Sequence, residues 1–535
     1  MVLSKFKRLL ALLLAIVMMF TLVGCNDDHD RDDDDKRQES NKDDEDDSWM
    51  GSDEAEEVVI DGITYHKALD LTKDEITLTY FHFDQDETVQ ALAERFMEIY
   101  PNITVNVIYE NIATHKDKLL AYNDNGQLPD VFMYSDCDFV LAQNMLADIT
   151  RFYDADPETQ NLADTISECG LGCYSTDVRW AVPVRFFPGV MYVDRNAVDT
   201  LGQQLPAKDW TWAEMIRLIK DCTIYDRPEG EYYGLGYYNR LDSYYQIAAD
   251  QAAVGEFGFD GTDFDLKVWA IGEQEFANLK MAGYVAPVQG TLEMEAWLGD
   301  AYAWCGATGR VAVFAEPFWT YQNLWATEAY QGYGLDIVPY VVPAVSEEDA
   351  SVEHRTMATI DFGGVSATCD YPREAYELLK FMSFGVDGWK TRISLYKDET
   401  IVNAVRMPLK YDQMPVPITK DEEIWKAYID MFCADMDMEH KALWEDYFAS
   451  CMQPIPYSWA SIVGLWDYSV EYFNKLNFHE LVDCGSKKAT EIVEEATIMA
   501  NYYHAQAMLS YFGPGGYDVL SKDEIAQYDE MIIRN

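Results

Sequence analysis

The residues best suited to ligand chemistry in this sequence are charged and aromatic side chains that lie in or just after apolar segments. The segment 309–325, GRVAVFAEPFWTYQNLW, ends a predicted strand with Glu316 and, three residues later, Trp319. Arg185 stands alone in the apolar stretch VPVRFF at 182–187. An indole ring stacks on the apolar face of a pyranose, while carboxylates and guanidinium groups form charge-assisted hydrogen bonds with hydroxyls. This combination indicates binding of a hydroxylated ligand.

Two pairs of candidates lie where predicted strands end. Phe83 and Asp84 end one strand, and Tyr134 and Asp136 end another. In open α/β sheets, ligands bind beyond the carboxyl ends of the strands. Both aspartates are therefore either hydroxyl acceptors or helix caps.

The remaining candidates have stronger structural alternatives. Asp361, next to two glycines, has the same ambiguity as the other aspartates. Tyr238, Trp304 and Trp459 are each individually more typical of packing than of binding. The chain has 14 Trp, 36 Tyr and 24 Phe, so some of these amphipathic rings are expected to line a cleft. We predict no metal site and no cofactor.

Alternating strands and helices are predicted to position these side chains. Period-two and helical patterns predict strands at 75–83, 102–110 and 128–136, and helices at 86–101 and 116–126. Such alternation indicates βαβ units and a mainly parallel sheet. Two short strands are predicted around Pro183 and Pro188, and Thr211 with Glu214 predicts a capping box at the start of a helix.

The N-terminus has the pattern of an export signal. Residues 9–23 form an apolar run behind three basic residues, shorter than the roughly 20 residues of a membrane-spanning helix. The following LVGC resembles the lipobox of bacterial lipoproteins. That resemblance implies a signal peptide at 1–24 and a diacylglycerol on the thiol of Cys25, which becomes the first residue of the mature chain. An ordinary signal peptide is the alternative, although no A-x-A-like cleavage site follows.

The next segment, 25–57, is predicted to be a lipid-anchored acidic linker. Residues 26–57 contain 17 acidic and 4 basic side chains and little apolar surface, so the segment should be disordered and extended. The body, 58–535, has the composition of a globular chain. The formal net charge of −54 argues strongly against nucleic acid as a partner. Nine cysteines remain after Cys25, and the close pair Cys169 and Cys173 forms either a local disulfide or two free thiols.

Seven segments of the body, in order, resemble the extracellular solute-binding proteins of family 1, the sugar-binding subunits of ABC importers. They are ITLTYFHF…ALAERFMEIYPNITV, LPDVFMYSD with LADIT, WAVPVRFFPGVMYVDRNAV, DWTWAEMIRLIK, GRVAVFAEPFW, YGLDIVPYVVP and GGVSATCDYPREAYELLKFM. The similarity runs from about residue 75 to 390.

The resemblance implies an α/β, two-lobed fold of the periplasmic-binding-protein type, with a ligand cleft between the lobes and a helical C-terminal portion. Lobe 1 would hold approximately 70–183 and 363–395, and lobe 2 approximately 187–358 and 396–535. Segments 182–187 and 358–364 resemble the strands that cross between lobes, and Gly363 and Gly364 could absorb hinge rotation.

Together with the lipobox, this resemblance implies a lipid-anchored receptor on the extracellular face of the cell membrane. It would capture a carbohydrate, in our interpretation an oligosaccharide, by lobe closure and deliver it to ABC transporter permease subunits. The resemblance favours the cleft over the core for Trp319. We interpret Arg185 as a ligand donor, with an interlobe ion pair as the alternative.

Two other functions are kept as alternatives. Paired carboxylates with aromatics would suit a surface glycoside hydrolase, but 94 acidic residues produce such pairs by chance, and no H-E-x-x-H or G-x-S-x-G motif occurs. A binding protein for a non-sugar ligand such as a peptide is the second. We therefore predict a binding protein and not an enzyme.

Overall fold

The computed structural model describes residues 55–84, 86–169, 178–226, 230–237, 240–250, 256–325, 333–345, 355–397, 415–452, 454–457 and 462–512. Its strands are β1 (Ala55–Ile60), β2 (Ile63–Ala68), β3 (Ile76–His82), β4 (Ile103–Tyr109), β5 (Val131–Tyr134), β6 (Val182–Asp194), β7 (Tyr233–Leu235), β8 (Val311–Pro317), β9 (Ile337–Tyr340), β10 (Met357–Val365) and β11 (Ile455–Tyr457). A small hairpin contains β1 and β2. The large sheet has the order β4-β3-β5-β10-β6-β8-β7, with β9 paired to β6 and β11 to β10.

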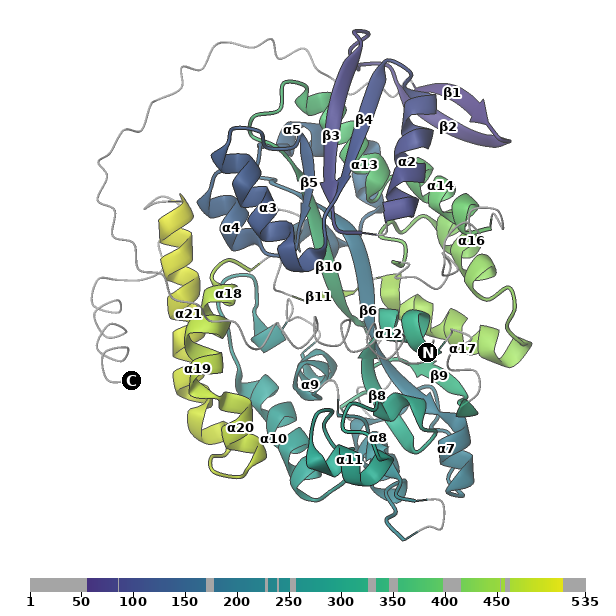
Figure 1. Ribbon diagram of the computed structural model, residues 1–535, viewed down its shortest axis with the longest axis vertical. Helices are drawn as coiled ribbons and strands as arrows, with labels where there is room; N and C mark the ends of the chain where they lie inside the picture. The colour runs from purple at the N-terminus through teal and green to yellow at the C-terminus, as the bar shows by residue number, and fades with distance from the viewer. Residues whose placement is uncertain are drawn as a thin grey trace.

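The first lobe is built on β3, β4 and β5, which are parallel and lie at the top of Figure 1. Its helices are α2 (Asp86–Ile99), α3 (Ile112–Asp124), α4 (Cys137–Ala142), α5 (Thr150–Ala155), α6 (Asp164–Cys169), α13 (Pro372–Met382) and α14 (Val386–Lys397). The predicted strand–helix alternation is confirmed. Helix α3 begins earlier than predicted, because the side chain of Asn111 accepts a hydrogen bond from the amide of Ala113 and caps its first turn.

The second lobe is built on β7, β8 and β9 and lies at the bottom of Figure 1. Its helices are α7 (Arg195–Thr200), α8 (Trp212–Asp221), α9 (Asp242–Ala249), α10 (Lys267–Met281), α11 (Leu292–Leu298) and α12 (Phe318–Thr320). The capping box of α8 is present as predicted: the hydroxyl of Thr211 accepts from the Glu214 amide, and the Glu214 carboxylate accepts from the Thr211 amide. The mixed α/β, two-lobed fold class is confirmed.

Strands β6 and β10 run through both lobes, as the predicted crossing segments would (Figure 1). The first half of β6 pairs antiparallel with β10, and the second half, from Gly189, pairs with β8 and β9. The prediction of two short strands here was wrong, since β6 is one continuous strand. This half of β6 has a ladder partner, β10, on one side only. Pro183 and Pro188 fit because a proline, which lacks an N–H group, is tolerated where that group would face the side without a partner strand.

The glycines of β10 serve close packing in this conformation. A Cβ on Gly363 would lie 2.7 Å from Val184 and 2.8 Å from Leu379, and one on Gly364 would lie 2.3 Å from Leu146. Their small size lets β10 pack tightly against its neighbours.

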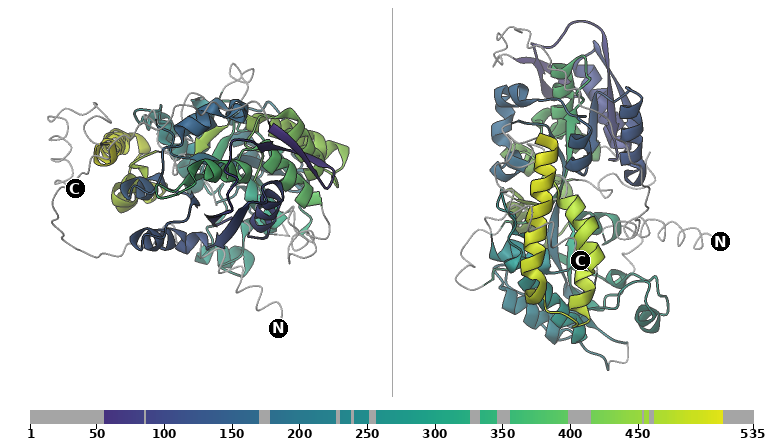
Figure 2. Two further views of the ribbon diagram at one scale, coloured as in Figure 1. Left: turned by 90° about the horizontal axis from the view of Figure 1, so that it is seen from above. Right: turned by 90° about the vertical axis from the view of Figure 1, so that its left-hand side faces the viewer.

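The C-terminal portion is helical, as predicted, and contacts both lobes. Its helices are α16 (Glu422–Phe432), α17 (Met438–Ala449), α18 (Leu465–Asp467), α19 (Asn474–Leu476), α20 (Phe478–Asp483) and α21 (Ala489–Phe512). We call residues 462–512 the C-terminal helical unit. Figure 2 shows α21 running along one side of the molecule, past the second lobe and up to the first.

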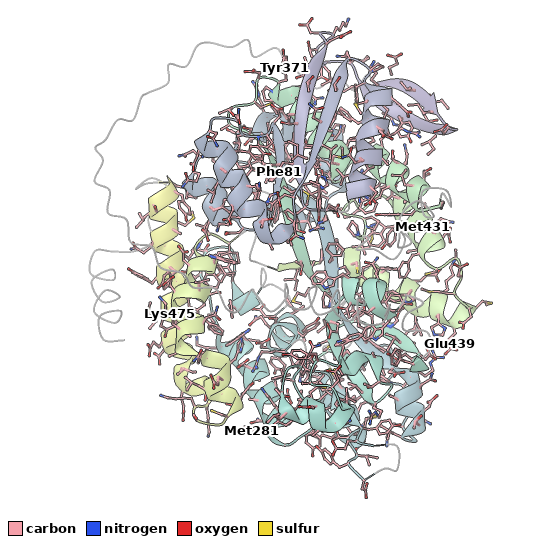
Figure 3. All side chains as sticks on the ribbon, viewed as in Figure 1. Phe81, Met281, Tyr371, Met431, Glu439 and Lys475 are labelled. Atoms are coloured by element: carbon pink, nitrogen blue, oxygen red, sulfur yellow. The ribbon has the colours of Figure 1, made fainter. Side chains whose placement is uncertain are left out.

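Side chains fill the interior of both lobes, with Phe81 inside the first lobe and Lys475 on the outside of the C-terminal helical unit (Figure 3). Among the described residues, none of the helices is long and apolar enough to cross a membrane. The predicted signal peptide, Cys25 and most of the acidic linker lie outside the described residues. Strand β1 begins at Ala55, just before the predicted end of that linker.

Candidate ligand-binding site

Arg185 lies at the centre of a buried ion-pair cluster between the two strands that cross between the lobes. Its Nε and Nη2 donate to Asp361 Oδ2 at 2.9 and 2.6 Å, and its Nη1 donates to Asp84 Oδ1 at 3.1 Å. Register explains the first contact, because Arg185 on β6 is directly opposite Asp361 on β10. Asp84 lies just after the carboxyl end of β3. All three side chains are buried, so in this structure Arg185 makes the ion pair that was the alternative interpretation.

The environment of this cluster sets its protonation. Burial alone would lower the pKa of Arg185, but Asp361 and Asp84 outweigh that effect and raise it. Burial raises the pKa of Asp361, and the guanidinium only partly opposes the rise. Breaking either contact would leave a buried charge with fewer partners.

An aromatic row extends from this cluster toward the second lobe. The guanidinium carbon of Arg185 lies 4.9 Å from the ring centre of Phe83 and 5.4 Å from that of Phe187. The Phe187 ring in turn meets Trp319 edge-on, at 5.4 Å between centroids. Trp319 is half-buried, whereas Phe83 and Phe187 are buried. The row thus ends on an aromatic surface that is partly open, at the carboxyl end of β8.

Glu316, in contrast, lies inside a buried polar group. It is only 2 % exposed, and the hydroxyl of Thr320 donates to its Oε2 at 3.3 Å. After burial, the charge of Glu316 is the largest effect that raises the pKa of Tyr244. Although Glu316 precedes Trp319 by three residues, it has the burial of a core group.

Tyr134 and Asp136 lie at the end of β5 but serve local structure. The ring of Tyr134 is fully buried and stacks on Phe362 at 6.1 Å. Asp136 caps helix α4 by accepting from the amide of Asp138 at 3.0 Å, and it pairs with Lys116 at 3.2 Å. The helix-cap interpretation of Asp136 therefore describes its position.

His115 is a site residue that the sequence reasoning missed. It is 3 % exposed, its ring stacks on Phe81 at 4.3 Å, and it meets Phe83 at 4.7 Å. Its Nε2 has no hydrogen-bond partner among the residues that the structure describes. Burial, reinforced by His82 and Arg185, lowers the pKa of His115 to about 3, so this imidazole is neutral. A single histidine in a polar helix gave no signal of this position.

The remaining candidates lie apart from this group or outside the described residues. Trp304 is 8 % exposed and packs against Trp325 at 5.3 Å. Tyr238 and Trp459 are not among the described residues, and neither are the side chains of Cys169 and Cys173. The structure therefore brings together Phe83, Asp84, Arg185, Trp319 and Asp361.

A model of the bacterial extracellular solute-binding protein family matches residues 91–385, more than half of the chain. The chain belongs to this family. Among curated proteins, none matches it significantly. Family membership confirms the predicted resemblance and the prediction of a binding protein over an enzyme.

Solved structures of other solute-binding proteins share the fold. An ABC substrate-binding protein from Listeria monocytogenes in complex with cycloalternan has 18% identity and a TM-score of 0.56, covering 81% of this chain and 100% of its own. A sugar transporter from Rhizobium etli, in an open conformation, has 14% identity and a TM-score of 0.59, covering 79% and 98%. The maltose/maltodextrin-binding domain MalE from Bdellovibrio bacteriovorus, bound to maltotriose, has 14% identity and a TM-score of 0.51, covering 80% and 99%.

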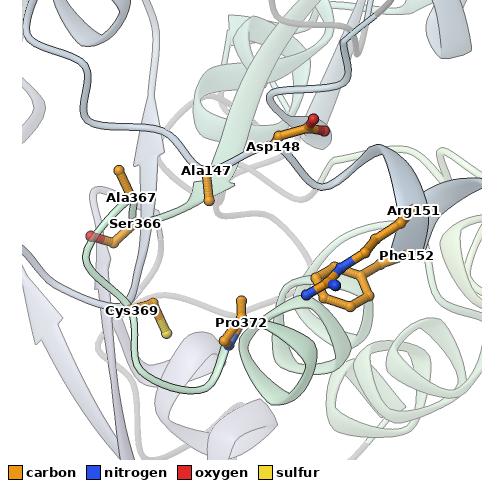
Figure 4. Close-up of a pocket in the computed structure, with 8 residues that line it drawn as sticks. All are labelled: Ala147, Asp148, Arg151, Phe152, Ser366, Ala367, Cys369 and Pro372. Atoms are coloured by element: carbon orange, nitrogen blue, oxygen red, sulfur yellow. The ribbon is translucent and has the colours of Figure 1, made fainter. Parts of the chain in front are cut away.

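A separate cavity lies at the opposite end of the first lobe of this solute-binding protein. It measures about 320 Å³, and residues lining it, such as Ser366 and Ala367, directly follow β10 (Figure 4). Because β5 runs antiparallel to β10, this cavity is beyond the amino ends of the parallel strands, away from Asp84. It is not part of the aromatic row.

One cluster outside the site has the side-chain types of a metal site. Asp242, Glu273 and His479 each place a ligand atom within 4.8 Å of the others. However, Arg240 already donates to both carboxylate oxygens of Glu273, at 2.9 and 2.7 Å. Burial lowers the pKa of His479 to about 4. We interpret the cluster as an ion-pair network that fixes helix α20 to α10, and we assign no metal to it.

Proposed function

We propose that this solute-binding protein is a lipid-anchored extracellular receptor that captures an oligosaccharide by lobe closure and delivers it to an ABC transporter permease. The observation that carries the proposal is the position of Trp319, a half-buried indole where β8 ends. It meets Phe187 in a T-shaped contact and stays partly exposed, so the exposed part of the ring is a candidate platform for a sugar face.

The surroundings of Trp319 suit an uncharged, hydroxylated ligand. Arg185 pairs with Asp84 and Asp361, and Arg392 also lies 3.9 Å from Asp84. The two positive and two negative charges of this buried cluster cancel, so the cluster offers no free cation to an anionic ligand. Two of the compared structures, 18% and 14% identical, hold cycloalternan and maltotriose, which supports a carbohydrate as the ligand class.

The arrangement of the strands supports lobe closure. Only β6, β10 and the short β11 would link lobe 1 (approximately 70–183 and 363–395) to lobe 2 within the described sheet. A ligand that contacts both lobes binds the closed state better and therefore shifts the population toward it.

A binding screen with product analysis tests the proposed function. We expect calorimetry with maltotriose, longer maltodextrins and cycloalternan to find at least one ligand that binds and is recovered unchanged. At 100 times its Kd such a ligand should raise the free energy of unfolding by about 2.7 kcal/mol. Cleavage of a glycosidic bond would contradict the proposal, and so would binding of peptides with no binding of any sugar.

The anchor is tested at Cys25. The Cys25→Ala variant lacks the thiol that would carry the lipid, so we expect it in the medium or as uncleaved precursor, because stable attachment needs the two acyl chains of the diacylglycerol. Cell fractionation with detergent extraction measures this. Cys484→Ala, which removes an exposed thiol of the folded body, is the matched control and should stay in the membrane fraction. Equal, detergent-dependent retention of both variants would contradict the anchor.

A further inference from the structure

The C-terminal helical unit is attached to the second lobe by an extensive aromatic contact. Trp269 on α10 is fully buried and meets Phe473 at 5.6 Å and Phe478 at 5.2 Å. Next to this contact, Arg240 donates to both carboxylate oxygens of Asp483 at 3.0 and 2.8 Å. Contacts of this size and burial make the unit move with the second lobe.

It contacts the first lobe where α21 lies against α4 and through two polar contacts beside that packing. The amide of Gly464 donates to Asp138 Oδ1, in the first turn of α4, at 2.8 Å. Lys116 on α3 lies 5.5 Å from the ring centre of Trp466. If the lobes rotate about β6 and β10, the unit travels with the second lobe, and these two polar contacts must break together with the packing of α21 on α4.

Gly464 presents its amide in a conformation that favours glycine. Its φ is 81°, and a Cβ there would lie 2.5 Å from the carbonyl oxygen of Tyr503 on α21. The carbonyl of Val463 also bonds to Nδ1 of His504 at 2.7 Å. The turn is therefore fixed to α21, and its N–H is pre-positioned for a partner on the first lobe.

Asp138 is an unusual partner, because its carboxyl is buried among other acids. The residue is 6 % exposed, and its Oδ2 has no hydrogen-bond partner among the described residues. The charged and titratable groups around it are Asp136 on its own element, Lys116 on α3, Asp467 on α18 and Tyr511 on α21. Three carboxyl groups thus share one lysine, at the junction between the first lobe and the C-terminal helical unit.

We propose that the Asp138–Gly464 contact is a proton-dependent latch, which holds the C-terminal helical unit against the first lobe and favours the lobe arrangement seen here. The inference rests on the proposed function in one respect, because only lobe opening and closure would give the latch a role. The inference adds a protonation site, Asp138, that lies outside the aromatic row and influences the same opening and closure of the lobes.

The direction of the pH effect follows from the two states of Asp138. In the docked state, burial and then the charge of Asp136 raise the pKa of Asp138 well above its ordinary value, and these effects outweigh the Gly464 N–H, which by itself favours the ionised carboxylate. Undocking exposes the carboxyl to water and removes the burial effect, so its pKa falls toward the ordinary value of about 3.9, although Asp136 stays beside it on the same element. Docking therefore takes up a proton. It is strongest below about pH 4 and weakens as pH rises through the raised pKa, with a change of at most about tenfold in the docking equilibrium per pH unit for one proton.

Distance measurements between spin labels test the latch in the full chain. With Cys484 replaced by serine, labels at Lys118→Cys on α3 and Lys475→Cys on α19 report the separation of the first lobe from the C-terminal helical unit; both sites are exposed. Without ligand, the short-distance population should dominate at pH 5 and decrease toward pH 8. Asp138→Asn, which keeps the acceptor but cannot ionise, should hold the short distance at every pH.

Two control variants distinguish an effect of Asp138 from a general effect of pH or of surface charge. Asp124→Asn removes an exposed carboxylate of the same helix as the first label and should leave the wild-type pH response intact. Gly464→Ala should shift the population to the long distance at every pH, while circular dichroism shows the fold retained. The latch is overturned if Asp138→Asn responds to pH as the wild type does, or if the wild type shows no response.

The outcomes also separate the latch from the proposed function. Sugar binding without a pH response would overturn the latch and leave the receptor proposal standing. A pH response lost in Asp138→Asn, with no sugar bound in the screen, would support the latch and count against carbohydrate as the ligand.

Discussion

Replacing Arg185 with alanine is expected to lower the free energy of unfolding by about 3–5 kcal/mol, because it leaves the buried Asp361 without its guanidinium and leaves Asp84 with only the more distant Arg392, at 3.9 Å. Arg185 is 4 % exposed and makes three hydrogen bonds to Asp361 and Asp84, all at 3.1 Å or less. Denaturant unfolding monitored by tryptophan fluorescence measures the loss.

A surface arginine provides the matched control. The side chain of Arg217 on α8 is 70 % exposed and lies 3.8 Å from Glu214, so Arg217→Ala should change stability by less than about 1 kcal/mol. A loss below about 1 kcal/mol for Arg185→Ala as well would mean that water reaches the cluster. It would also reopen the interpretation of Arg185 as a ligand donor.

Trp319→Ala is expected to weaken oligosaccharide binding at least tenfold, about 1.4 kcal/mol, with a smaller effect on folding. The indole is half-buried without ligand, so its exposed part is free to stack on a sugar and is used only in the complex. Calorimetric titration with the tightest sugar from the screen, and an unfolding curve on the same variant, separate the two effects.

Trp210 is the matched core tryptophan. It is 1 % exposed, packs on Tyr340 at 5.1 Å and donates its indole N–H to the carbonyl of Val341. Trp210→Ala should cost about 3–5 kcal/mol of stability, while the folded fraction binds sugar normally. If Trp319→Ala behaves like Trp210→Ala, then Trp319 belongs to the core and the proposed platform is wrong.

The local elements were predictable because their signals lie within a few residues. The strand before Phe83 and the capping box at Thr211 depend on alternation and on a contact between neighbours, and both are present as predicted. The continuity of β6 was not predictable in this way. Two prolines ordinarily interrupt a strand, and only the sheet order shows that they lie where β6 has its ladder partner on one side.

The site was only partly predictable, because its partners are distant in sequence. The residue types at Arg185, Asp84 and Asp361 indicated polar chemistry, but the pairs are 101 and 176 positions apart, so no local pattern shows that they neutralise one another. For Trp319 the end of an apolar strand was the useful signal, and the edge contact with Phe187 depends on β6 and β8 pairing through Gly189.

The position of β10 in the large sheet affects the stage of synthesis at which the first lobe can fold. Strand β5 ends at residue 134, but its neighbour β10 begins only at residue 357, after most of the second lobe has been synthesised. The first lobe therefore cannot complete its sheet during early synthesis, and contacts over such separations slow folding. A chain emerging for export would stay unfolded until a late stage, whereas a fragment truncated before β10 would leave the edge of β5 open to pairing with another chain.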